Sequence, residues 1–139
     1  MENRYSVVSE GQSLRRDKTS YLEKGHIVGE KYADYLSRSK CFLFGTSVFK
    51  YPLLKFFEGM ASGTCVLSDL PLQHENFHLK PEENMVEINV DNWEDRLTYY
   101  LENDGERRRI ALEGYKMTMK HHTNDVRAAQ LVKFLEEHR

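Results

Sequence analysis

Residues 32–69 constrain the fold of this chain more than any other stretch, because signals for helix, strand, loop, helix and strand follow one another within it. Residues 41–44, CFLF, form a continuous apolar run that is typical of a strand buried on both faces of a sheet. Residues 64–67, TCVL, form a second such run, and apolar residues at helical spacing lie between the two. This order predicts two parallel strands joined by a crossover helix.

The boundaries of this unit are marked by residues with special backbone preferences. Small, hydrogen-bonding residues at 45–47, GTS, end the first strand. Pro52 suits the first turn of the next helix, where a missing N–H costs nothing, and apolar residues recur from Leu53 onward. Gly63 is placed to end that helix as a C′ glycine. The loop before the helix is therefore short and tightly defined.

The flanking segments extend the α/β pattern. Residues 30–39 read as an amphipathic helix with Tyr32, Tyr35 and Leu36 facing inward. The alternating residues 85–90, MVEINV, predict the last strand. Helices are expected over residues 93–103 (capped by Asp91 or Asn92), 106–120 and 125–138, with a break at Asp104-Gly105. The prediction is a single three-layer α/β domain over residues 1–139 with a mainly parallel sheet, in which residues 1–20 are the least ordered.

Composition excludes several classes of function. A net charge of −2 with well-mixed acids and bases argues against broad nucleic-acid binding. No stretch approaches a transmembrane segment, and the N-terminal residues MENRYSVV do not resemble a signal peptide. The two cysteines, Cys41 and Cys65, lack a CxxC spacing and fall in predicted buried strands, which indicates reduced thiols and a cytoplasmic protein. The His121-His122 pair lacks further ligands in its neighbourhood, so no metal is expected.

The loop between the first strand and its helix is the candidate ligand site. In open α/β sheets, ligands bind outside the carboxyl ends of the strands, beside helix N-termini. Glu58 lies two turns into the helix that follows the loop. The sequence therefore predicts a phosphorylated ligand at the loop, with Glu58 reaching its hydroxyl-bearing part.

The residues around Glu58 resemble a known family. The segment FFEGMASGTCVLSD resembles the signature of retaining glycosyltransferases of the GT-B fold, whose usual form is L-E-A-M-A-x-G-x-P-V-V. Its flanks, GHIVGEKYADYLSRSKCFLF, KYPLLKFFEGMASG and HHTNDVRAAQLVKFL, are similar to the CgeB-like branch of the group 1 glycosyltransferases. The resemblance covers residues 24–136 and implies a Rossmann-like domain that forms the C-terminal, donor-nucleotide-binding half of a GT-B fold.

The resemblance implies roles for particular positions. The residue matching Glu58 hydrogen-bonds ribose hydroxyls, backbone N–H groups over residues 49–54 meet the diphosphate, and the region of His26 lines the base pocket. It implies no cofactor, no metal and no catalytic residue in this half. The candidate substrate-binding residues are Glu58, Thr46, Ser47, Lys50, Tyr51, Leu53, Leu54, Lys55 and His26.

The chain also departs from the family pattern. Many members carry a first glutamate eight residues before the second, where this chain has Lys50. The glycine-rich loop E-G-F-G is replaced by K-Y-P-L, and the basic pair that grips the diphosphate has no clear match, which makes Lys50 and Lys55 its candidate substitutes.

Two functions remain open from the sequence. In the first, the chain binds a nucleotide-diphosphate sugar and needs a missing N-terminal acceptor-binding domain, since a GT-B enzyme needs about two domains of this size. The 139-residue chain alone would then be inactive. In the second, it is a non-catalytic nucleotide- or protein-binding module. A flavodoxin-like signalling domain would need an acidic cluster at the strand ends, where Asp69 stands alone.

Overall fold

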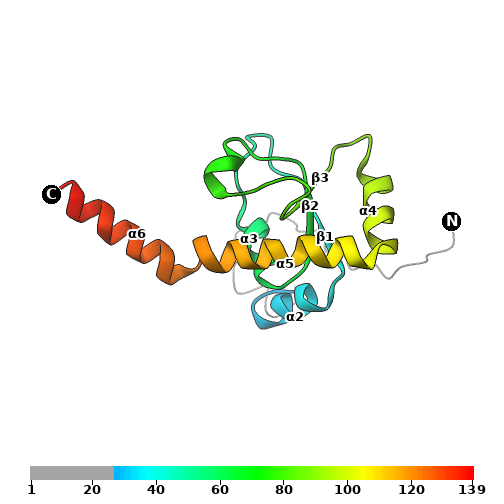
Figure 1. Ribbon diagram of the computed structural model, residues 1–139, viewed down its shortest axis with the longest axis horizontal. Coiled ribbons are helices and arrows are strands. Elements are labelled where there is room, and N and C mark those ends of the chain that lie inside the picture. The colour runs from blue at the N-terminus through cyan, green and yellow to red at the C-terminus, as the bar shows by residue number, and fades with distance from the viewer. Residues whose placement is uncertain (1–26) are drawn as a thin grey trace.

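The computed structural model describes residues 27–139, which are arranged around a small parallel sheet (Figure 1). The expectations for residues 1–20 and for His26 fall outside the described residues. Strands β1 (Cys41–Leu43), β2 (Cys65–Ser68) and β3 (Val86–Glu87) form a three-stranded sheet in the order β1-β2-β3, and both pairs are parallel. The predicted Rossmann-like α/β fold with a parallel sheet is confirmed.

Helices surround this sheet. In chain order they are α2 (Glu30–Arg38), α3 (Leu54–Ala61), the short 3-10 helix η1 (His74–Phe77), α4 (Trp93–Glu102), α5 (Asp104–His121) and α6 (Asn124–Glu137). Figure 1 shows the long helix α5 crossing the body of the molecule and α6 extending away from it toward the C-terminus. Among residues 27–139, no helix combines the length and the apolar character needed to cross a membrane.

The core lies on both faces of the central strand β2. Because successive strand residues point to opposite faces, Val66 packs with Phe56 of α3 on one side. Cys65 packs on the other side with Tyr100 of α4 and Ile110 of α5. Helix α5 contributes to both clusters, since Met117 near its other end joins the α3 side. The sheet is therefore covered on both faces, as a three-layer fold requires.

The outer strands are less buried and shorter than the sequence predicts. All four residues of β2 are buried, but Leu43 of β1 is 40% exposed. The prediction that residues 41–44 are buried on both faces is wrong, because β1 lies at the edge of the sheet that residues 27–139 form. β3 ends at Glu87 rather than at residue 90, because Asn89 turns the chain by accepting hydrogen bonds from the backbone N–H groups of Asp91 and Asn92.

Several predicted helix boundaries also shift. Helix α3 begins at Leu54, so Pro52 lies before the helix rather than in its first turn, and Leu53 keeps an extended backbone. Helix α5 begins at Asp104, which moves the expected break to Asn103, where φ is −104° and ψ is 77°. Gly63 follows α3 with φ of 75°, as a C′ glycine should.

Two predicted side-chain roles near helix surfaces are wrong. Of the three residues of α2 expected to face inward, Leu36 is buried and Tyr32 is half-buried, but Tyr35 is exposed. Asn92 precedes α4 but makes no side-chain cap. Its Oδ1 instead accepts a hydrogen bond from the Asn89 backbone at 2.8 Å, because the turn after β3 competes for it.

Gly114 of α5 lies at a close approach between this helix, α3 and the segment before β3. A Cβ at this position would lie 2.7 Å from the backbone oxygen of Asn84 and 3.0 Å from Cγ of Met60. We expect Gly114→Ala to lower the free energy of unfolding by roughly 1–3 kcal/mol through overpacking. This change would outweigh the gain of about 1 kcal/mol in helix propensity. The matched control is Gly105→Ala in the same helix, where nothing lies within 4 Å of the added Cβ. Urea unfolding should show this control unchanged or stabilised, and equal effects of both substitutions would contradict close packing at Gly114.

Candidate functional site

The loop after β1 and the turn after β2 meet at one edge of the sheet, where the Asp69 carboxylate joins them. Asp69 Oδ1 accepts hydrogen bonds from the Thr46 backbone N–H at 2.6 Å and from Ser68 Oγ at 3.4 Å. Its Oδ2 accepts from Thr46 Oγ1 at 2.5 Å and from Lys50 Nζ. A carboxylate has about four acceptor positions, so these contacts use its capacity. Asp69 is thus an anchor of the loop rather than a free ligand group.

The same loop is held by its own backbone. Lys50 has a left-handed backbone with φ of 54°, and its carbonyl accepts a hydrogen bond from the Leu72 N–H at 2.9 Å. The Lys50 N–H donates to the Ser47 carbonyl at 2.8 Å, and Ser47 Oγ accepts from the Phe49 N–H at 3.3 Å. The conformation of residues 46–50 is therefore determined from two sides.

The negative charge of Asp69 at this edge is compensated by the positive charge of Lys50. Burial by itself would raise the pKa of the Asp69 carboxyl. The hydrogen bonds from Lys50 and Thr46 outweigh burial and lower the pKa from 3.8 to about 2. Asp69 is therefore ionised at neutral pH, and the Lys50 ammonium compensates its charge.

Helix α3 starts directly after this loop with an N-terminus that no side chain caps. Its N-cap residue is Leu53, which cannot accept a hydrogen bond through its side chain, and its first turn contains no acid. Among the helices of residues 27–139, every other α-helix carries an acid in its first turn. The Phe56 N–H donates to the Leu53 carbonyl at 3.2 Å, and the N–H groups of Leu54 and Lys55 remain available to an external anion.

Glu58 lies on the side of α3 that faces α2. Its carboxylate is half-buried, and the Tyr32 hydroxyl lies 3.5 Å from Oε2 in position to donate a hydrogen bond. Burial, and next the nearby Glu58 charge, raise the pKa of Tyr32 to about 12. The Tyr32 ring packs edge-on against Phe42 of β1. Glu58 therefore keeps acceptor capacity beyond its contact with Tyr32.

The remaining candidates lie in different surroundings. The structure brings Thr46 and Lys50 together on Asp69, whereas the side chain of Leu53 packs against the core. Tyr51 is exposed and stacks on Phe49 with ring centroids 5.5 Å apart, and Leu54 is exposed as well. Lys55 is exposed, with its Nζ 5.9 Å from the centroid of the Phe44 ring.

Sequence reasoning missed the role of Asp69. The sequence treats Asp69 only as a solitary acid that does not fit a flavodoxin-like site. The signal that could have found its role is its position, since Asp69 directly follows β2 and Gly45 to Ser47 come shortly after β1. The carboxyl ends of adjacent parallel strands lie at one edge of the sheet, and this places Asp69 and Thr46 close together.

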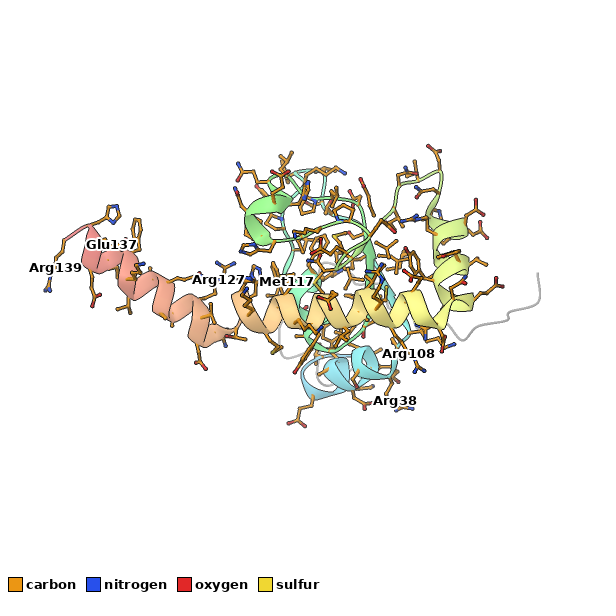
Figure 2. All side chains as sticks on the ribbon, viewed as in Figure 1. Arg38, Arg108, Met117, Arg127, Glu137 and Arg139 are labelled. Atoms are coloured by element: carbon orange, nitrogen blue, oxygen red, sulfur yellow. The ribbon has the colours of Figure 1, made fainter. Side chains whose placement is uncertain are left out.

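A histidine cluster lies at the junction of α5 and α6. The His121 ring stacks on His78, while the His122 ring stacks on Phe57 of α3, so the adjacent histidines point to different partners. His122 Nε2 donates to the Phe77 carbonyl at 3.0 Å, and its Nδ1 accepts from Arg127 at 2.7 Å. Burial lowers the pKa of His122 to about 4, and the Arg127 cation acts in the same direction. Figure 2 shows Arg127 at the start of α6, and its contact with His122 links this helix to the end of α5.

Other surface features lie away from the loop edge. One shallow hollow lies on α6, between Val132 and Arg139, and another lies between the 78–84 segment and α5. Two of the lysines that line the second hollow are paired with acids, in Lys80–Glu83 and Lys116–Glu113. Within residues 27–139, no group of three His, Cys, Asp or Glu side chains could hold a metal ion.

Comparison with known proteins adds one finding. A family model described as glycosyl transferase-like matches residues 3–133, which include β1, the loop, α3 and Asp69. No curated protein and no solved structure matches the chain.

Asp69→Asn should destabilise the protein at neutral pH, because the charged hydrogen bonds from Lys50 and Thr46 would weaken. The pKa of Asp69 is lower in the folded state than its ordinary value, so its contribution is complete above about pH 4 and is lost as the pH falls toward 2. We expect a cost of about 2 kcal/mol at pH 7 that shrinks by roughly half at pH 3. Urea unfolding of both proteins at the two pH values measures it. Asp91→Asn, at an exposed acid, is the control, and a pH-independent cost for Asp69→Asn would contradict the ionised anchor.

Proposed function

We propose that this chain, which belongs to the glycosyl transferase-like family, is the donor-binding domain of a GT-B glycosyltransferase. It binds a nucleotide-diphosphate sugar at the carboxyl edge of its sheet. The observation that carries the proposal is the uncapped N-terminus of α3, which follows the loop held by Asp69 and precedes Glu58. These features support the proposal, because one short helix carries both an uncapped N-terminus and an acid with free acceptor capacity.

The diphosphate fits the start of α3. The first N–H groups of a helix lack partners within the helix, and the helix dipole makes this end positive. Lys55 adds a cation in the first turn, where the other α-helices of the described chain carry acids. A phosphate at such an end gains several charge-assisted hydrogen bonds. The same groups would stabilise the diphosphate as it leaves the sugar.

Lys50 reduces the repulsion between the Asp69 carboxylate and a diphosphate bound at this edge. Without its ammonium, the ionised Asp69 would repel a diphosphate bound near the loop. The contact between Lys50 Nζ and Asp69 Oδ2 compensates that charge, and Lys50 remains about half exposed. Its backbone is held by Leu72 and Ser47, so a bound diphosphate would attract the ammonium without rearranging the loop.

Glu58 is suited to the ribose. It is half-buried on α3, downstream of the helix start, and its one described side-chain partner is the long contact from Tyr32. An ionised carboxylate can accept hydrogen bonds from two neighbouring hydroxyl groups. A nucleotide whose diphosphate lies at the N-terminus of α3 would thus place its ribose along the side of the helix.

Apolar side chains at this edge support a second domain opposite it. Val48 is 91% exposed and Phe49 is 65% exposed, and Tyr51, Leu54 and Leu72 are exposed as well. Exposed apolar groups near a ligand site are typical of surfaces that another domain covers. We therefore place the acceptor-binding domain of the intact enzyme against this edge, where it would close the site around the sugar.

A non-catalytic binding module is the second candidate. The observation that favours it concerns Lys50, which lies where many family members have an acid. The Lys50 ammonium donates a hydrogen bond to Asp69 and is therefore already engaged within the chain. Such a module would bind the nucleotide but would support no transfer in any assembly. Nucleotide binding and sugar transfer therefore have to be measured separately.

Glu58→Gln should weaken nucleotide binding by about tenfold or more, because hydrogen bonds to a charged group contribute roughly 1.5–3 kcal/mol. Thermal shift with UDP, GDP, ADP, CMP and dTDP identifies the nucleotide, and calorimetry then gives its dissociation constant for each variant. Glu102→Gln, at an exposed acid near the end of α4, is the control and should bind as the unsubstituted chain does. Unchanged affinity together with a lower melting temperature for Glu58→Gln would show that Glu58 is structural.

The 139-residue chain alone should bind the nucleotide weakly and transfer no sugar, because one wall of the site is open to water. Product formation from the matching nucleotide sugar is followed with and without the acceptor-binding domain. Turnover is expected only when both domains are present. Steady turnover by the 139-residue chain that Glu58→Ala abolishes would contradict the two-domain site, and binding without transfer by both domains together would favour the non-catalytic module.

A further inference from the structure

The two cysteines of the chain lie side by side on neighbouring strands of the sheet. Cys41 begins β1 and Cys65 begins β2, and they are partners in the parallel register. Residues in register point to the same face of a sheet. Parallel strands lie about 4.7–4.9 Å apart, which is inside the usual Cα separation of about 4.4–6.8 Å for disulfides. Both cysteines are free thiols in the structure.

Their environments differ in a way that assigns separate roles. Cys65 is fully buried, whereas Cys41, on the edge strand, is partly accessible. The neighbouring Cys65 thiol, and after it the Arg107 and Lys40 cations, lower the pKa of Cys41 against the effect of burial. The neighbouring Cys41 and burial raise the pKa of Cys65. Cys41 is therefore the accessible nucleophile, and Cys65 is the thiol held beside it.

The positive charge near Cys41 is built into the fold. Arg107 of α5 is only 5% exposed, and its Nη1 donates to the Tyr100 carbonyl at 3.1 Å and to Asp104 Oδ1 at 2.5 Å. A cation fixed beside a thiol favours the thiolate, which is the reactive form of cysteine. The pair thus combines a stabilised nucleophile, a neighbouring thiol and the required strand spacing.

We propose that Cys41 and Cys65 form a reversible intramolecular disulfide when the protein meets hydrogen peroxide. The Cys41 thiolate attacks one peroxide oxygen, the O–O bond breaks, and the departing hydroxide takes up a proton to become water. Cys65 then loses its thiol proton and attacks the Cys41 sulfenic sulfur, and the sulfenic oxygen leaves as a second water. The two thiols are together oxidised by two electrons, and one peroxide is reduced to two waters.

Thiol–disulfide exchange at the partly accessible Cys41 can reverse the modification. The bond would link the strands whose carboxyl ends carry Thr46 and Asp69. The proposal is independent of nucleotide binding.

The test uses the full chain treated with hydrogen peroxide, then unfolded in denaturant so that both thiols are accessible, blocked with N-ethylmaleimide and measured by intact mass. The expected product is a monomer that has lost two hydrogens and both sites of maleimide addition, and dithiothreitol should restore both. Because the chain has only two cysteines, an intramolecular disulfide can join no other pair. Unchanged maleimide addition, or dimers linked between chains, would overturn the proposal.

Two variants separate the roles of the thiols. Cys65→Ser should stop at the sulfenic acid, which dimedone traps on Cys41. Cys41→Ser should lose the reaction, because the buried Cys65 lacks both access and a lowered pKa. Circular dichroism verifies that both variants are folded, and the mass measurement on the unsubstituted chain does not depend on them. Reaction of Cys41→Ser as fast as the unsubstituted chain would refute Cys41 as the nucleophile.

Discussion

Burial of β2 between two parallel neighbours is the constraint on which the described structure depends. Its residues are buried on both faces, so α3 must cover one side while α4 and α5 cover the other. Parallel pairing then sends the carboxyl ends of β1 and β2 to the same edge. The Asp69 network, the loop and the start of α3 are close together because of this pairing. The Cys41–Cys65 pair is its counterpart at the start of the same strands.

Charge compensation shapes the candidate site. An ionised Asp69 near a proposed diphosphate would be unfavourable alone, but it is bound by Lys50 and by both donors of Thr46. The carboxylate thus organises the loop while the positive end of α3 remains free. Glu58, on the α2 side of the helix, retains acceptor capacity. A domain with this arrangement separates loop anchoring from ligand recognition, and this separation underlies the proposed function.

Much of the fold could be predicted from local patterns, and the errors share a cause. The apolar runs at residues 41–44 and 64–67 predicted both strands, but they could not show that β1 lies at the edge of the described sheet with Leu43 exposed. Leu79, within a segment that reads as a polar loop, is fully buried beneath the α3 cluster. The start of α3 moved to Leu54 because Leu53 keeps an extended backbone, and Asn92 accepts a hydrogen bond from the Asn89 backbone instead of capping α4. Burial and hydrogen-bond choice depend on neighbours that are distant in the chain.

The sequence by itself determined the alternation of strands and helices, the short loop before α3 and the position of Glu58 within that helix, because these follow from periodicity and from glycine and proline preferences. Only the tertiary structure decided that Asp69 anchors Thr46 and Lys50, that Glu58 contacts Tyr32 and that Cys41 faces Cys65. Each of these contacts joins residues more than fifteen positions apart. Their geometry depends on strand register and helix packing, which are set by the whole core.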